Sequence, residues 1–271
     1  MVDLAVDRLV HVYRSSGVRA VDGVSLRIEA GERVALIGQN GSGKTTLVRH
    51  LDGLLRPTEG SVTVGGADAS RLTVAQLAAR VGLVFQDPDR QVFAGSVRAE
   101  VEFGPRNLRR SGAELREAVA DALTATGLED EERTNPYDLG GSRRKLLALA
   151  SVLAMRTPVL VLDEPTTGQD ARGVERVRSV VSAVAAEGRT VIAISHDMRF
   201  VAENFERVVV MRAGRVVLDG SPADVFGRSS WEALRSTYLE PPLAAVVGDR
   251  LGLGATPTDA ALIESLAGVA S

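Results

Sequence analysis

The stretch GQNGSGKTTL, residues 38–47, constrains the fold of this chain more than any other part of its sequence. It follows the short apolar, β-prone run RVALI (33–37) and precedes TLVRHLDGLL, which has the pattern of a helix over about 44–54. Glycines let successive backbone N–H groups turn inward, and a helix N-terminus adds partial positive charge. This arrangement predicts an anion-binding loop, and the alternative is a chance glycine-rich turn.

The loop matches the pattern G-x-x-x-x-G-K-[ST] at Gly38, Gly43, Lys44 and Thr45. In that pattern the lysine reaches the β- and γ-phosphates of a nucleotide, and the next hydroxyl holds Mg²⁺. We expect nucleotide contacts along the whole loop, which comprises Gly38, Gln39, Asn40, Gly41, Ser42, Gly43, Lys44, Thr45 and Thr46. The loop alone predicts a nucleotide with Mg²⁺ and does not say which nucleotide.

Apolar runs alternate with helical patterns through the middle of the chain. The runs VGLVFQ (81–86), PVLVLDEP (158–165) and TVIAISHD (190–197) are apolar until their last residues. Continuous apolar strands between helices predict an α/β fold with a parallel sheet covered on both faces.

Other segments predict strands and helices around that sheet. Residues 4–13 and 24–30 alternate in the manner of strands, and 207–220 predicts a hairpin around Ala213 and Gly214. Residues 96–127 predict helices that break near the proline-containing FGPRN at 103–107.

Polar residues that suit phosphate chemistry follow directly after the apolar strands. Ligands of such sheets bind beyond the carboxyl ends of the strands, so Gln86, Asp163, Glu164 and His196 should meet the loop there. Asp163 could reach Mg²⁺ through water, and Glu164 could polarise the water that attacks the γ-phosphate. The Gln86 amide oxygen could also bind Mg²⁺, and His196 could hydrogen-bond the γ-phosphate.

Each of these side chains has a purely structural alternative. Asp163 and Glu164 could cap a helix, His196 could be a core histidine, and Gln86 could be an ordinary loop residue. Tyr13 ends the first predicted strand, where its ring could stack on adenine or simply be half-buried at a sheet edge.

Composition narrows the classes of function. The net charge of −3 gives no electrostatic case for nucleic-acid binding. The chain has no cysteine, which excludes disulfides, thiol catalysis and thiolate metal sites. No apolar run approaches the roughly 20 residues of a membrane span, so any membrane association should be peripheral.

With these motifs in order, residues 3–226 resemble an ATP-binding cassette ATPase. GQNGSGKT resembles the Walker A loop, VLVLDEP the Walker B strand, and TTGQD (166–170) the D-loop. Gln86 matches the Q-loop, His196 the switch histidine and Tyr13 the adenine-stacking position. The resemblance implies an ABC-type P-loop fold with ATP and Mg²⁺ as ligands. That fold has a RecA-like parallel-sheet core, an antiparallel β subdomain and an α-helical subdomain.

The resemblance also implies a division of the chain into two domains. The nucleotide-binding domain is expected at 1–221, with its helical subdomain at about 87–157. From residue 222 the sequence pattern changes to short helical segments with a Pro-Pro break and a glycine-rich turn. Residues 222–271 are therefore expected to form a small helical appendage, which in the family helps two ATPases to dimerise.

A narrower resemblance lies at residues 81–108, which are similar to the Q-loop region of energy-coupling factor transporter ATPases. The matching residues are Pro88, Asp89, Gln91, Glu100, Phe103, Gly104 and Asn107. That family serves uptake of vitamins and of cobalt or nickel. Its two ATPases bind a shared membrane scaffold and drive a separate substrate-binding membrane subunit, which implies a peripheral place at the cytoplasmic face of the membrane. The alternatives are the ATPase of another ABC transporter and a soluble, non-transport ABC ATPase.

The family signature L-S-G-G-Q is altered in this chain to LGGSRRK at 139–145. Spacing to Asp163 puts Gly140 at the serine position, Ser142 at the second glycine and Arg143, a cation that could attract phosphate, at the glutamine. Alternatively, a one-residue shift makes Gly140 and Gly141 the glycine pair and puts Leu139 at the serine position; the signature is degenerate in either case. In the family the signature of one chain covers the ATP of the other. Contacts with ATP are therefore implied for Gly140, Gly141 and Ser142, and for Asp170 of the D-loop. The missing hydroxyl favours a heterodimer with a paralogous ATPase over a homodimer.

Overall fold

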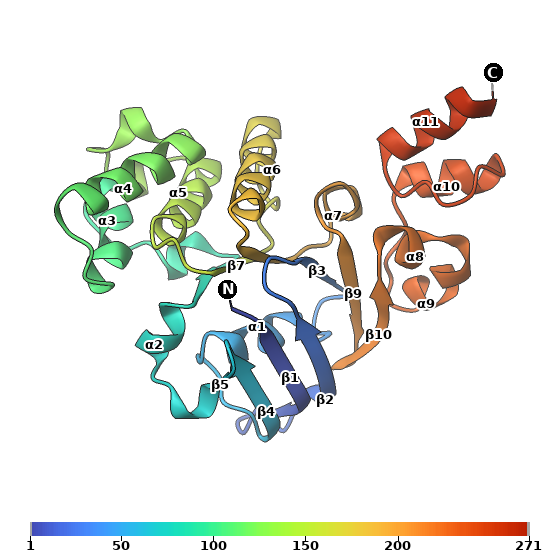
Figure 1. The fold of residues 1–271 in the computed structure, drawn as a ribbon, viewed down its shortest axis with the longest axis horizontal. Coiled ribbons are helices and arrows are strands. Elements are labelled where there is room, and N and C mark those ends of the chain that lie inside the picture. Colours follow the sequence, from blue (N-terminus) through green and yellow to red (C-terminus); the bar gives the residue numbers. More distant parts are fainter. Residues whose placement is uncertain (1, 270–271) are drawn as a thin grey trace.

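The computed structural model describes residues 2–269 and builds them into two sheets flanked by helices (Figure 1). Met1, Ala270 and Ser271, which the expected domains include, lie outside the described residues. The first sheet is antiparallel and has the strand order β2-β1-β4-β5. Its strands are β1 at Leu4–Val12, β2 at Arg19–Ile28, β4 at Glu59–Val64 and β5 at Ala67–Asp68.

The second sheet has the order β10-β9-β3-β8-β7-β6 and is parallel except for its edge strand β10. Its strands are β3 at Arg33–Ile37, β6 at Val81–Val84, β7 at Val159–Asp163, β8 at Thr190–Ile194, β9 at Arg207–Arg212 and β10 at Arg215–Gly220. The expected hairpin is confirmed, since β9 and β10 flank Ala213 and Gly214. The parallel sheet and the antiparallel subdomain are confirmed as well.

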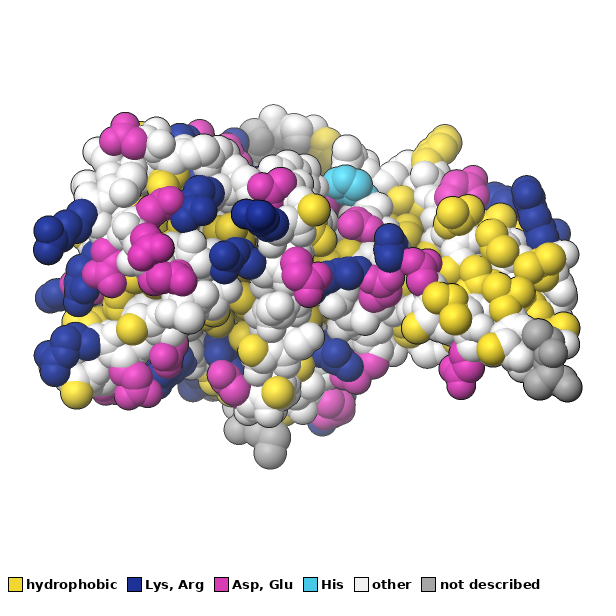
Figure 2. Space-filling view, turned by 90° about the horizontal axis from the view of Figure 1, so that it is seen from above, with side chains coloured by type: hydrophobic (Ala, Val, Ile, Leu, Met, Phe, Trp, Pro, Cys, Tyr) yellow, Lys and Arg dark blue, Asp and Glu magenta, His cyan; other side chains and the backbone are white. Residues whose placement is uncertain are grey.

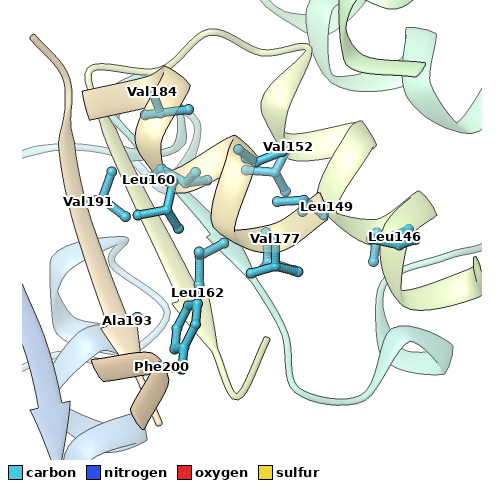
Figure 3. Close-up of a cluster of buried hydrophobic side chains, with 14 of the residues drawn as sticks. Leu146, Leu149, Val152, Leu160, Leu162, Val177, Val184, Val191, Ala193 and Phe200 are labelled. Carbon is cyan, nitrogen blue, oxygen red and sulfur yellow. The ribbon is translucent and has the colours of Figure 1, made fainter. Parts of the chain in front are cut away.

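The central strands of the parallel sheet are buried on both faces, which explains why they are apolar at almost every position. In β7, Val159 and Val161 join a core cluster shared with the first sheet and the helix α1 (Lys44–Leu51). Leu160 and Leu162 point to the opposite face and join the cluster beneath the helices. Figure 3 shows this second cluster, in which side chains of β7 and β8 meet those of the overlying helices.

Some helices cover the sheet, and others lie on either side of it. They are α2 at Val74–Ala78, α3 at Val97–Asn107, α4 at Gly112–Thr126, α5 at Gly141–Leu153, α6 at Ala171–Ala186, α7 at Met198–Asn204, α8 at Pro222–Phe226, α9 at Trp231–Arg235, α10 at Leu243–Arg250 and α11 at Asp259–Val269. The helices α3, α4 and α5 form the expected helical subdomain on one side of the sheet. The helices α8 to α11 lie on the other side (Figure 1).

One expected helix boundary is wrong, and one expected break lies at the end of its predicted segment. The helix after the glycine-rich loop ends at Leu51, because Gly53 takes a φ of 78° that ends the helical path. The break expected near 103–107 follows Asn107, where α3 ends, and α4 begins at Gly112. The helix α3 continues through Pro105 before that break. Pro105 lies in the last turn, where its missing N–H removes one hydrogen bond, and its ring packs on the buried face of the helix with Val97 and Val101.

The appendage is joined to the core rather than held apart from it. Val225, Phe226, Leu234 and Ala245 belong to the same core cluster as the helices above the sheet. The Trp231 indole N–H donates a 2.7 Å hydrogen bond to the Phe226 carbonyl, which closes α9 onto α8. Within residues 2–269, no helix has both the length and the apolar character needed to cross a membrane.

Candidate functional site

A pocket of about 610 Å³ opens where β3, β7 and β8 end. Its lining comprises Tyr13, Val18, Ala20, residues 38–46, Gln86, Asp163, Glu164, Ile194, His196 and Leu239. The structure therefore brings the predicted loop and all four predicted strand-end residues to one place. It also adds four apolar residues, Val18, Ala20, Ile194 and Leu239, which carry no chemical motif that the sequence could have revealed.

Two glycines of the loop are required by its geometry. Gly38 has a φ of 147° and Gly43 a φ of 102°, a region that side chains disfavour. A Cβ at Gly38 would clash with the Met211 carbonyl, and one at Gly43 with the Ala20 carbonyl. Gly43 is the N-cap residue of α1 and provides no side-chain cap, so the N-terminal N–H groups of the helix remain available for an anion.

Lys44 is buried within the loop that precedes it. Its Nζ donates hydrogen bonds to the carbonyls of Gly38 (2.7 Å) and Gln39 (3.0 Å). Burial lowers the pKa of Lys44, and the nearby carboxylates of Glu164 and Asp163 oppose that shift. The ammonium group thus lies in the loop whose backbone N–H groups would hold phosphate.

Asp163 and Thr45 bring two oxygen ligands together. The Thr45 hydroxyl donates a 3.1 Å hydrogen bond to Asp163 Oδ2, and burial raises the pKa of Asp163. Gln86, which is exposed, lines the same pocket. A hydroxyl, a carboxylate and an amide oxygen form a donor set that suits Mg²⁺, a cation that prefers oxygen ligands and shares them with phosphate.

Glu164 and His196 form a hydrogen-bonded pair across the ends of β7 and β8. Glu164 Oε2 lies 2.8 Å from His196 Nδ1. The Glu164 N–H donates to the Ile194 carbonyl at 2.9 Å, which fixes its backbone to the neighbouring strand. Glu164 has a φ of 52°, a left-handed conformation that is strained for a residue with a side chain. The carboxylate is buried, whereas the imidazole is largely exposed.

Tyr13 lies at the rim of the pocket and is held from two sides. Its hydroxyl is 3.1 Å from the Thr46 hydroxyl, and its ring meets the His11 ring edge-on at 4.7 Å. The ring is therefore oriented by neighbours in both the first sheet and the glycine-rich loop.

The predicted signature and D-loop residues do not line this pocket. Gly140, Gly141 and Ser142 are at the N-terminus of α5, and Asp170 caps α6 by accepting a 2.7 Å hydrogen bond from the Gly173 N–H. The Ser142 hydroxyl donates a 2.5 Å hydrogen bond to Gln169 Oε1, a contact that sequence reasoning did not predict.

Arg143 is less available to phosphate than its sequence position suggests. Its guanidinium forms a 2.6 Å ion pair with Glu131 and donates a 3.0 Å hydrogen bond to the Gly127 carbonyl. The expected free cation at the glutamine position of the signature is thus engaged within its own subdomain.

A model of the ABC transporter family matches residues 21–167, which is just over half of the chain. The match contains the glycine-rich loop, Gln86, Asp163 and Glu164, the residues that the fold brings into one pocket. The chain therefore belongs to the ABC transporter family and is one of its ATPases.

Individual relatives agree with this assignment. The chain is 38% identical over 248 residues to the energy-coupling factor transporter ATP-binding protein EcfA of Methanothermobacter thermautotrophicus, covering 91% of this chain and 79% of that protein. It is 43% identical over 242 residues to a putative ABC transporter ATP-binding protein of Caldanaerobacter subterraneus subsp. tengcongensis. That alignment covers 89% of this chain and 42% of the relative, so the chain spans less than half of the relative's length.

Among solved structures, the fold is similar to cbiO1 from Clostridium perfringens, which is described as part of the ABC transporter complex cbiONQ. The TM-score is 0.74 with 36% sequence identity, and the match covers 86% of this chain and 93% of cbiO1.

Proposed function

We propose that the chain is the ATP-hydrolysing subunit of an energy-coupling factor-type importer that transports a vitamin or a cobalt or nickel ion. The observation that carries the ATPase site is the pocket where the Lys44 loop meets Asp163, Glu164 and His196. The similarity to EcfA and cbiO1, together with the residues at 81–108, supports the energy-coupling factor type.

In this proposal the glycine-rich loop and α1 hold the phosphates of ATP. Backbone N–H groups and the N-terminus of α1 donate to phosphate oxygens, and Lys44 exchanges its loop carbonyls for the β- and γ-phosphates. Tyr13 stacks on adenine, since its ring lines the same pocket. Thr45, Asp163 and Gln86 would hold Mg²⁺, which neutralises phosphate charge when bound.

Glu164 accepts a proton from the attacking water, and His196 positions the Glu164 carboxylate. The 2.8 Å contact with His196 Nδ1 and the backbone bond to Ile194 restrict the carboxylate to one orientation. A carboxylate held in this way orients the water for in-line attack on the γ-phosphate.

The altered signature supports an asymmetric pair of ATPases. Gly140 offers no hydroxyl, the Ser142 hydroxyl donates to Gln169, and Arg143 is paired with Glu131. Losing one or two donors to phosphate costs roughly 2–4 kcal/mol of transition-state stabilisation, by analogy with oxyanion-hole deletions. Gly140, Gly141, Ser142 and Asp170 would face the ATP bound by the second chain. That chain would be a paralogue with an intact signature.

The remaining partners are a membrane scaffold and a substrate-binding membrane subunit, which place the chain at the cytoplasmic face of the membrane. The appendage would contribute to the pairing of the two ATPases. Figure 2 shows hydrophobic side chains gathered over the appendage, at the right of the view. Exposed apolar residues there are Leu243, Leu251, Ile263, Leu266 and Val269.

The test is ATP hydrolysis by the purified chain alone and mixed with a cassette ATPase that has an intact L-S-G-G-Q. We expect a slow rate alone and a rate at least about tenfold higher on mixing, because the partner's signature completes the Lys44 site. Glu164→Gln in this chain should remove most of that increase while leaving ATP binding intact.

Two results would contradict the proposal. Full activity of the chain alone would show that LGGSR works as a signature, and the asymmetry would be wrong. Absence of ATP binding to the chain in the presence of Mg²⁺ would overturn the assignment of the pocket itself.

A further inference from the structure

Leu239 comes from the appendage and yet lines the pocket that holds Lys44 and Glu164. It lies between α9 and α10, and its half-buried side chain also packs against the core cluster beneath the helices. The other apolar lining residues, Val18, Ala20 and Ile194, belong to the two sheets or the turn between their strands. Leu239 is therefore the point where the appendage reaches the pocket.

The segment around Leu239 is fixed at both ends. Thr237 is fully buried, and its hydroxyl donates a 2.6 Å hydrogen bond to the Leu234 carbonyl. Pro241 and Pro242 are buried on the other side, and each has a φ restricted by its ring. A leucine held between two anchors keeps its position against the pocket at little further cost in conformational entropy.

Tyr238 turns the chain so that its neighbour faces inward. Its φ of 58° is a left-handed conformation that is uncommon for residues other than glycine. The Tyr238 N–H donates a 2.8 Å hydrogen bond to the Arg235 carbonyl, and its side chain is 84% exposed. Strained residues of this kind persist where the surroundings impose them, often beside functional sites.

We infer that Leu239 contacts the bound nucleotide, and that through it the appendage responds to nucleotide occupancy. This inference rests on the proposed function, which places ATP in the pocket. An alkyl side chain cannot bond phosphate, so Leu239 acts by van der Waals contact and by excluding water from the pocket. Any change that the nucleotide imposes on Leu239 passes to α9, which ends four residues earlier at Arg235.

The appendage carries its own optical reporter. Trp231, the only tryptophan of the chain, begins α9 and is 4% exposed. The guanidinium carbons of Arg228 and Arg235 lie 4.7 and 5.3 Å from the centre of its ring. A small shift of α9 would change this charged surrounding and hence the fluorescence of Trp231.

The experiment measures MgATP affinity by calorimetry and, in parallel, Trp231 fluorescence. For Leu239→Ala we expect the Kd to rise about three- to tenfold and the fluorescence change to shrink, since the alanine removes apolar contact. Leu239→Met, which conserves volume, should retain an affinity close to that of the unmodified chain. Leu253→Ala is the matched control, because Leu253 is a half-buried leucine of the appendage that does not line the pocket.

An unchanged Kd for Leu239→Ala would overturn the inference, as would an equal loss of affinity in Leu253→Ala. If MgATP does not change the Trp231 fluorescence of the unmodified chain, the claim that the appendage responds to the nucleotide is wrong. Lys44→Ala separates failure of the proposed function from failure of this inference. If Lys44→Ala binds MgATP as tightly as the unmodified chain, the proposed function fails. If Lys44→Ala loses affinity and Leu239→Ala does not, the inference alone fails.

Discussion

At the scale of single residues, Asp52 carries a charge that the fold disfavours. It follows α1, is 6% exposed, and its Oδ1 accepts a 2.9 Å hydrogen bond from the Leu54 N–H. Burial raises the pKa of Asp52 from its ordinary 3.8 to about 6. The folded protein thus binds the carboxyl proton of Asp52 more tightly than the unfolded chain does. The associated stabilisation is present below about pH 3.8 and is lost as the pH rises through about 6.

We expect Asp52→Asn to raise the free energy of unfolding at pH 8 by about 1–3 kcal/mol, because the amide can keep the Leu54 hydrogen bond without a charge. At pH 4 the difference should be close to zero, since Asp52 is protonated in the fold there. Urea unfolding at the two pH values measures it, with the exposed Asp130→Asn as control. A variant that is less stable at pH 8 would instead indicate that Arg49 stabilises the Asp52 anion.

At the scale of elements, Glu100 ties α3 to the segment that follows the Q-loop. It is 2% exposed, and its Oε2 accepts hydrogen bonds from the Phe93 (3.0 Å) and Ala94 (2.7 Å) N–H groups. Glu100→Ala leaves both donors without this acceptor and should lower the free energy of unfolding by about 1–3 kcal/mol. Glu117→Ala, which removes a 66% exposed partner of Arg156, should change it by no more than about 0.5 kcal/mol. Equal effects of the two changes in urea unfolding would argue against this anchoring role.

The N-terminus of α5 offers a second prediction at this scale. The combined change Gly140→Ser, Ser142→Gly and Arg143→Gln installs L-S-G-G-Q and frees Gln169 and Glu131 from their present partners. ATP hydrolysis by the chain alone should rise about tenfold or more, because a self-pair would then supply the missing hydroxyl. Adding Glu164→Gln to this variant should abolish the gain. An unchanged rate would mean that the signature does not limit the chain.

Elements and site residues differ in how far the sequence predicts them. Continuous apolar runs predict β6, β7 and β8, and their ends carry Gln86, Asp163 and His196 into one pocket. The course of α3 through Pro105 is not predictable from local preference, because packing of the ring on a buried face overrides it. Leu239 is not predictable either, since a leucine has no chemical signature and its place depends on how the appendage packs.

At the scale of the whole molecule, the apolar patch of the appendage should determine how strongly two chains associate. This patch comprises the exposed residues Leu243, Leu251, Ile263, Leu266 and Val269. Ile263 is 66% exposed on α11 within the apolar patch. Ile263→Asp should weaken ATP-dependent association about tenfold or more, because a carboxylate would be desolvated in the interface. The association is measured by sedimentation of the chain carrying Glu164→Gln, mixed with the partner cassette and MgATP. Glu264→Gln, on the same helix as Ile263, is the control. Association that is unaffected by Ile263→Asp would exclude this face from the pairing.

Strand register sets a limit on how this protein can change in evolution. Asp163 pairs with Ile194 across β7 and β8, and Leu36 pairs with Ile194 across β3 and β8. A one-residue insertion in β7 would move Asp163 along the strand by about 3.3 Å and turn it to the opposite face. Point substitutions at the apolar positions of these strands should therefore alter how much folded enzyme exists. Insertions or deletions there should destroy the chemistry outright, so we expect length variation only in the segments between the strands.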